Sequence, residues 1–141
     1  MTENVKKTQL TAIAAIRECL ESGRKSDIVC LLIPSATRHN KPIGAQKQAI
    51  WAGQALDLFG EIFTGATAFQ HLKGIFCLRD GSAPMYDDPI MVQPLAYRAD
   101  VENEKYLLKL AQFVQNMGSE TDQHSVGVIL NNWFINIEIG A

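Results

Sequence analysis

The residues best suited to chemistry lie in a polar loop that follows the first apolar run of the chain. This loop contains Arg38, His39 and Lys41, and no acidic residue occurs between Asp27 and Asp57. The loop leads into an expected helix, whose free backbone N–H groups and dipole favour an anion. The pattern predicts a binding site for a small anionic ligand, phosphate-like or a nucleotide. A solvated loop that serves solubility alone is the alternative.

Each polar side chain of this loop has a defined part in the expected anion site. The guanidinium group of Arg38 is expected to donate two parallel hydrogen bonds to a phosphate or carboxylate, and Lys41 is expected to add a second positive charge. Ser35 and Thr37 donate hydroxyl groups. His39 is the histidine that suits general acid or base chemistry, although a structural, solvent-exposed histidine is the simpler interpretation.

A second polar segment, residues 64–67, supplies two hydroxyl groups and a glycine. It is expected to form a backbone-lined wall of a small pocket, or else a helix end that needs small residues for close packing. The complete predicted ligand-binding set is Ser35, Thr37, Arg38, His39, Lys41, Thr64 and Thr67.

Other site chemistries find no support in the residue spacing. His39, His71 and His124 are far apart in the sequence and none has a metal-ligating partner at i+2, i+3 or i+4, so no metal is expected. The chain contains no GxGxxG, GxxxxGK[ST] or GxSxG sequence, so no cofactor is expected and the catalytic residues stay unknown.

The three cysteines, Cys19, Cys30 and Cys77, form no CxxC or CxxH motif. An odd number without such spacing suits neither a disulfide framework nor a zinc site. We predict three reduced thiols that are mostly buried and act as small core hydrophobes.

Size and composition indicate one globular domain over residues 1–141. Hydrophobic residues make up 47% of the chain and charged residues 20%, and the net charge is −2. That charge does not favour a general nucleic-acid surface. The longest apolar run is six residues, at 28–33, and no signal peptide is recognisable, so a cytoplasmic protein is expected.

The hydrophobic periodicity predicts alternating helices and strands. Residues 28–33 form an unbroken apolar run, which indicates a central strand buried on both faces. The other expected elements are a helix over 8–22, a helix over 45–63, a strand over 74–79, a return strand within 86–97, a helix over 101–116, and a hairpin with arms 125–130 and 133–139.

This order predicts an α+β fold, a ferredoxin-like (split βαβ) antiparallel sheet with an extra N-terminal helix and a C-terminal β-hairpin. Helices would cover one face of the sheet. The bare second face must be hidden, either by the N-terminal segment, 1–24, packed on the domain or by a second subunit. A homodimer through the sheet or helices is therefore expected.

Part of the chain resembles small uncharacterised bacterial α+β proteins in which a helix ends in an FGGAT-like segment. The resemblance covers about residues 30–80 and rests on short segments: Ile33-Pro34-Ser35, Trp51, Leu58-Phe59-Gly60 and Gly65-Ala66-Thr67. It implies a compact α+β domain and transfers no activity.

These observations lead to one expected function and two alternatives. We expect a non-enzymatic cytosolic binding or accessory domain that holds a small anionic ligand at the loop after the first strand. The alternatives are a small phosphoryl- or acyl-transfer enzyme that uses His39 with Arg38 and Lys41, and a nucleic-acid-associated module, which rests on analogy of fold alone.

Overall fold

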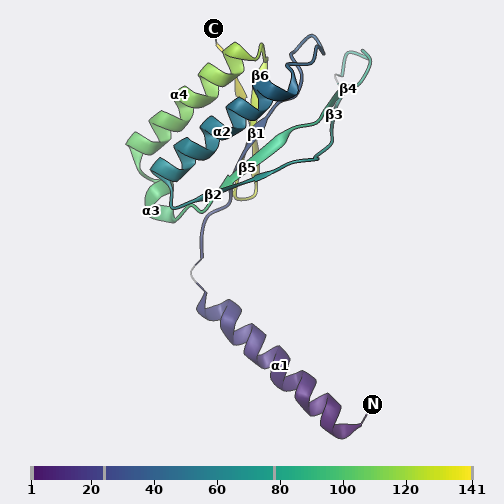
Figure 1. The fold of residues 1–141 in the computed structure, drawn as a ribbon, viewed down its shortest axis with the longest axis vertical. Helices are drawn as coiled ribbons and strands as arrows, with labels where there is room; N and C mark the ends of the chain where they lie inside the picture. Colours follow the sequence, from purple (N-terminus) through teal and green to yellow (C-terminus); the bar gives the residue numbers. More distant parts are fainter. Residues whose placement is uncertain (1, 24, 78, 141) are drawn as a thin grey trace.

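The computed structural model describes residues 2–23, 25–77 and 79–140, and its main body is a five-stranded antiparallel sheet covered on one face by two helices (Figure 1). The strand order is β2-β5-β1-β6-β7. The sheet strands are β1 (Val29–Ile33), β2 (Ala66–Phe69), β5 (Ile90–Pro94), β6 (Ser125–Leu130) and β7 (Trp133–Glu138). The helices are α1 (Glu3–Ser22), α2 (Ala45–Ile62), α3 (Arg98–Val101) and α4 (Glu104–Glu120).

The core lies between the sheet and the two long helices, α2 and α4. Leu31 and Ile33 of β1, Phe59 of α2 and Met117 of α4 have no exposed surface. Burial of each such apolar side chain stabilises the fold by about 1.5–3 kcal/mol relative to leaving it in water. Residues 29–33 of the apolar run form the central strand, as predicted, whereas Ile28 lies outside the strand and is exposed.

The chain builds the sheet from two strand–helix–strand units whose strands interleave. β5 lies between β1 and β2 of the first unit, and β1 lies between β5 and β6 of the second. The predicted α+β class, with an N-terminal helix and a C-terminal hairpin, is confirmed. The ferredoxin-like name stays a prediction.

Several elements differ from the sequence prediction. Residues 66–69 form β2 instead of ending a tight connection, and the predicted strand at 74–79 shortens to β3 (Gly74–Phe76). β3 pairs only with β4 (Met85–Asp87), and the two form an arm that projects beyond the sheet (Figure 1). β3 has no place in the main sheet because β5 pairs with β1, and β2 occupies the edge position beside β5.

The last helix begins and ends later than its periodicity predicted. Asn103 caps α4, because its side chain accepts hydrogen bonds from the N–H groups of Lys105 and Tyr106. Gly118, two residues beyond the predicted helix end, lies inside α4 against Ile139, where a Cβ atom would come within 2.4 Å of the isoleucine side chain. Its glycine identity therefore serves close packing rather than helix termination.

Helix α1 leads away from the sheet, and none of its residues is buried (Figure 1). The predicted packing of segment 1–24 on its own domain is therefore not seen in the single chain. No described helix is long and apolar enough to cross a membrane.

The face of the sheet opposite α2 and α4 carries a row of apolar side chains, and we call it the helix-free face. The strand register brings together Phe69, Met91 and Leu32 in one row, and Ile129 and Phe134 in the next. Phe69 is 41% exposed and Phe134 58% exposed.

The prediction of three buried thiols is wrong for two of them. Cys30 is buried, but Cys19 in α1 and Cys77 in the β3–β4 arm are exposed, and all three are free. Their apolar neighbours in sequence suggested a core, whereas α1 and the arm project into solvent.

Candidate functional site

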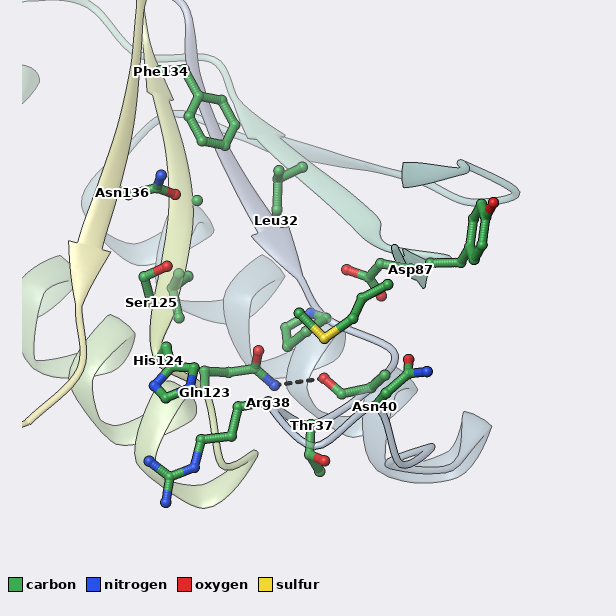
Figure 2. Close-up of a pocket in the computed structure, with 16 residues that line it drawn as sticks. Leu32, Thr37, Arg38, Asn40, Asp87, Gln123, His124, Ser125, Phe134 and Asn136 are labelled. Carbon is green, nitrogen blue, oxygen red and sulfur yellow. Dashed lines mark hydrogen bonds between the residues drawn. The ribbon is translucent and has the colours of Figure 1, made fainter. Parts of the chain in front are cut away.

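A cavity of about 220 Å³ lies at one end of the helix-free face, where β1, β6 and β7 meet the loop after β1 and the base of the β3–β4 arm (Figure 2). Three segments that are far apart in the sequence, 32–40, 85–87 and 123–136, converge here. The side chains that line the cavity include Leu32, Pro34, Thr37, Arg38, Asn40, Met85, Tyr86, Asp87, Gln123, His124, Phe134 and Asn136.

The loop after β1 owes its shape to backbone hydrogen bonds within it. The Thr37 N–H donates to the Lys41 carbonyl at 2.8 Å, and the Asn40 N–H donates to the Thr37 carbonyl at 2.9 Å. Asn40 adopts φ +58°, a left-handed conformation that asparagine tolerates. The Thr37 hydroxyl oxygen accepts from the N–H groups of His39 and Lys41, so it caps the loop.

Arg38 is neutralised by an acid that the local sequence does not contain. Its Nε lies 2.9 Å from Oδ1 of Asp122, which belongs to the turn between α4 and β6. The backbone strengthens this contact, because the Arg38 N–H donates to the Asp122 carbonyl at 2.8 Å. The nearby Gln123 side chain donates to the Ala36 carbonyl at 2.7 Å (Figure 2). The positive charge predicted to bind an anion is therefore already paired.

Asp87 presents the fixed negative charge of the cavity. Its Oδ1 accepts two hydrogen bonds from Ser35, one from the backbone N–H at 2.8 Å and one from the hydroxyl at 2.5 Å. The Ser35 hydroxyl oxygen in turn accepts from the Asp88 N–H at 2.8 Å. Within the described part of the chain, Oδ2 of Asp87 accepts no hydrogen bond, so one carboxylate oxygen is available to a ligand.

The cavity walls combine apolar surface with a few polar groups. Leu32 and Phe134 form the apolar side, and they close over Gly127, where a Cβ atom would lie 2.8 Å from the Phe134 ring. Asn136 and Ser125 lie across the cavity from Asp87 (Figure 2). An apolar cleft with few polar groups is the usual form of a small-molecule site.

The structure separates the seven predicted site residues. Thr37 and Arg38 line the cavity. Ser35 does not line it, but its hydroxyl donates a hydrogen bond to Asp87, which does. His39 is exposed, with Nε2 3.8 Å from Asp122 Oδ2, and Lys41 is exposed. Neither lines the cavity, so the geometry gives no support to an enzyme that uses them with Arg38.

The segment 64–67 is not part of this cavity. The start of β2 pairs with Pro94 at one end of β5, whereas the loop after β1 lies near Ile90 at the other end. Thr64 and Thr67 therefore lie toward the opposite end of the sheet from Arg38.

Sequence reasoning missed the residues that give the cavity its character, above all Asp87, His124 and Phe134. Asp87 and Asp88 stand out only as a pair of acids beside a turn, and such pairs are common in solvated loops. No local signal in the sequence marks the approach of the arm to the loop, which depends on the Ser35–Asp87 hydrogen bonds. Among the described residues, no group of three or more His, Cys, Asp or Glu side chains is arranged to hold a metal ion.

Comparison with known proteins gives matches of structure alone. No family model matches the chain, and no curated protein matches it. A phage SAM lyase in complex with S-methyl-5'-thioadenosine matches with a TM-score of 0.56 and 11% identity, over 82% of this chain and 92% of the lyase. A phage SAM lyase in the apo state matches with a TM-score of 0.56 and 12% identity, over 85% and 96%.

These matches correct the predicted function. The expectation of a non-enzymatic accessory domain is contradicted, because the two matching structures that share this fold are those of a lyase, an enzyme. At this level of identity the likeness establishes the fold of the chain and leaves its chemistry to be argued from the cavity.

Proposed function

We propose that this chain is an enzyme that binds a sulfonium nucleoside, S-adenosylmethionine (SAM) or a close relative, in the cavity and cleaves it as a lyase. Two independent facts support the proposal. The fold matches a SAM lyase over nearly the whole length of that enzyme. The cavity has the charge and surface that a cation with an aromatic base requires.

The observation that carries the proposal is the carboxylate of Asp87, held by Ser35 with one oxygen free. The cationic side chain on the cavity wall, Arg38, is paired with Asp122, so the available charge of the site is negative. The aromatic ring of Phe134 also lines the cavity (Figure 2). A ligand cation is attracted by a carboxylate and by the face of an aromatic ring.

The expected reaction follows from the chemistry of the ligand. Formation of S-methyl-5'-thioadenosine breaks the bond between the sulfonium sulfur and the four-carbon amino acid fragment, and the electron pair remains on sulfur. As this bond breaks, an oxygen of the fragment's own carboxylate forms a bond to the same carbon, which closes a lactone. The positive charge on sulfur and the negative charge on the carboxylate are lost together, so apolar walls such as Leu32 and Phe134 favour the neutral thioether over the sulfonium ion.

Asp87 therefore has a role in recognising charge, and the substitution Asp87→Asn tests it. Asparagine keeps an oxygen that accepts from Ser35 but removes the negative charge. Loss of a charged contact worth about 1.5–3 kcal/mol weakens binding by about tenfold to 150-fold. We expect this loss for SAM and little change for neutral S-methyl-5'-thioadenosine, both measured by calorimetric titration.

The activity is measured by incubating the purified chain with SAM and quantifying S-methyl-5'-thioadenosine by liquid chromatography and mass spectrometry. Asp57→Asn is the matched control, because Asp57 is exposed on α2 and does not line the cavity. Absence of both product formation and SAM binding in the unaltered chain overturns the proposed function. Equal weakening of SAM and S-methyl-5'-thioadenosine in Asp87→Asn overturns the role in charge recognition.

A further inference from the structure

Helix α1 is a 20-residue amphipathic helix without a partner in the single chain. Its apolar residues are exposed by between 45% and 74% and fall on one side of the helix: Val5, Leu10, Ile13, Ile16 and Leu20. Most helical stability in proteins comes from packing of such a face, and isolated helices are marginal in water. We call these five side chains the stripe of α1. A stable α1 therefore requires an apolar surface to cover the stripe.

The helix-free face is an apolar surface of the same kind and is also uncovered. Phe69, Met91, Leu32, Ile129 and Phe134 form its apolar rows, and no described helix of the same chain covers them (Figure 1). A sheet with one helix layer normally hides its second face when that face is apolar.

The N-terminal segment and the rest of the chain have net charges of opposite sign. Residues 1–26 contain five basic and three acidic residues, a net charge of +2, whereas residues 27–141 contain eight basic and twelve acidic residues, a net charge of −4. Helix α1 itself contains three residues of each sign, so the excess positive charge belongs to Arg24 and Lys25, which follow it. The apolar match, and not charge, therefore carries the case for α1 as the covering element.

The connection between α1 and the sheet is short, and it leads the helix away from its own sheet (Figure 1). The chain is fixed at Asp27, whose N–H donates to the Ala96 carbonyl at 2.7 Å and whose carboxylate pairs with Arg98 at 2.9 Å. Only residues 23–26 lie between the helix and this anchor. Four residues span at most about 14 Å, and a layer packed on a sheet lies about 10 Å from it, so little chain is left to reverse direction.

We propose that α1 of one copy packs on the helix-free face of a second copy, and that the second copy returns the same contact. This reciprocal exchange covers both stripes and both sheets with one two-fold arrangement, the commonest symmetry of oligomers. Leu32 and Phe134 belong to the helix-free face and also to the cavity wall, so α1 of the partner adjoins the candidate site.

The experiment measures molar mass by light scattering during size-exclusion chromatography, and it needs no substrate. The unaltered chain is expected to elute with twice the 15.6 kDa mass of one chain. The double variant Ile13→Asp, Ile16→Asp places charges in the stripe and is expected to elute with the mass of one chain. Thr11→Asp is the matched control, because Thr11 is exposed on the opposite side of α1, and it should retain the dimer mass.

Variants of the helix-free face complete the test. Phe69→Asp is expected to give single chains, and Phe134→Asp, at an exposed position of β7, provides a second variant if the first unfolds. A stripe variant mixed with a face variant still offers one intact helix and one intact face, so the mixture is expected to recover a species of two chains.

Three outcomes overturn the proposal. An unaltered chain that stays single at all concentrations shows that α1 remains free or folds onto its own sheet. A dimer that survives in both folded face variants but not in the stripe variant shows that α1 pairs with α1. Mixing that recovers no two-chain species excludes the exchange. None of these results depends on whether the chain cleaves SAM.

Discussion

Arg38 shows how a distant partner changes the function of a residue. The local sequence predicts a free cation in an acid-free segment, but Asp122 lies 84 positions further along the chain and pairs with it at 2.9 Å. The same folding event brings Asp87 to Ser35. The end of the sheet therefore changes from an expected anion site to a cavity whose available charge is a carboxylate.

The three thiols differ in exposure, and this predicts different reactivity. Burial raises the pKa of the Cys30 thiol above its ordinary value of 9.0, whereas Cys19 and Cys77 are exposed. Because the thiolate is the reactive form, a disulfide reagent at neutral pH should modify two thiols quickly and Cys30 only slowly. The reaction is followed by absorbance in dilute protein, and Cys30→Ala should remove the slow phase alone. Three equally fast thiols would contradict the burial of Cys30.

The raised pKa of Cys30 also predicts how stability depends on alkaline pH. Well below pH 9.0 the thiol is protonated in both the folded and the unfolded chain and has no effect. As the pH rises above that value, the unfolded chain releases the proton while the folded chain keeps it, so the free energy of unfolding falls. Denaturant titrations between pH 8 and 10 should show a smaller fall in Cys30→Ala; an identical fall would refute the assignment.

At the scale of elements, the helical periodicities and the apolar run of β1 were sufficient to predict α2, β1 and the C-terminal hairpin. In each of those segments, the spacing of the apolar residues brings them to a buried surface in only one type of secondary structure. The segment 66–97 was harder, because its four short strands divide between the sheet and the arm. Which strand joins β1 depends on pairing across the sheet, and short strands carry weak local signals.

Two glycines at the ends of α2 predict opposite effects of alanine. A Cβ atom at Gly60 meets no atom within 4 Å, and the residue is exposed inside the helix. Gly60→Ala should therefore stabilise the fold by about 0.5–1 kcal/mol. Gly44 has φ +92°, so Gly44→Ala should destabilise it by about 1 kcal/mol.

Both glycine variants are compared with the unaltered chain by thermal unfolding, where 1 kcal/mol corresponds to about 2–4 °C in Tm for a chain of this size. Shifts of the same sign in the two variants would contradict the backbone conformations described for Gly44 and Gly60. Neither residue lines the candidate cavity, so SAM binding serves as an internal control.

At the scale of the whole molecule, reciprocal exchange of α1 makes stability depend on protein concentration. A partner that binds the folded chain alone stabilises it by mass action. We therefore expect Tm to rise with concentration in the unaltered chain and to stay constant in the Ile13→Asp, Ile16→Asp variant. Differential scanning calorimetry over a hundredfold range of concentration checks this. A constant Tm in both proteins would contradict the exchange.

The sequence by itself determined the α+β class, the central strand and the amphipathic character of the N-terminal helix, because these depend on the spacing of apolar residues along the chain. Only the tertiary structure decided which charges are free, since Asp122 and Asp87 reach the loop after β1 from distant segments. It also shows α1 with no buried residue and the chain anchored at Asp27, five residues after the helix ends. Local patterns specify which surfaces are apolar or charged, but contacts between distant segments decide what those surfaces meet.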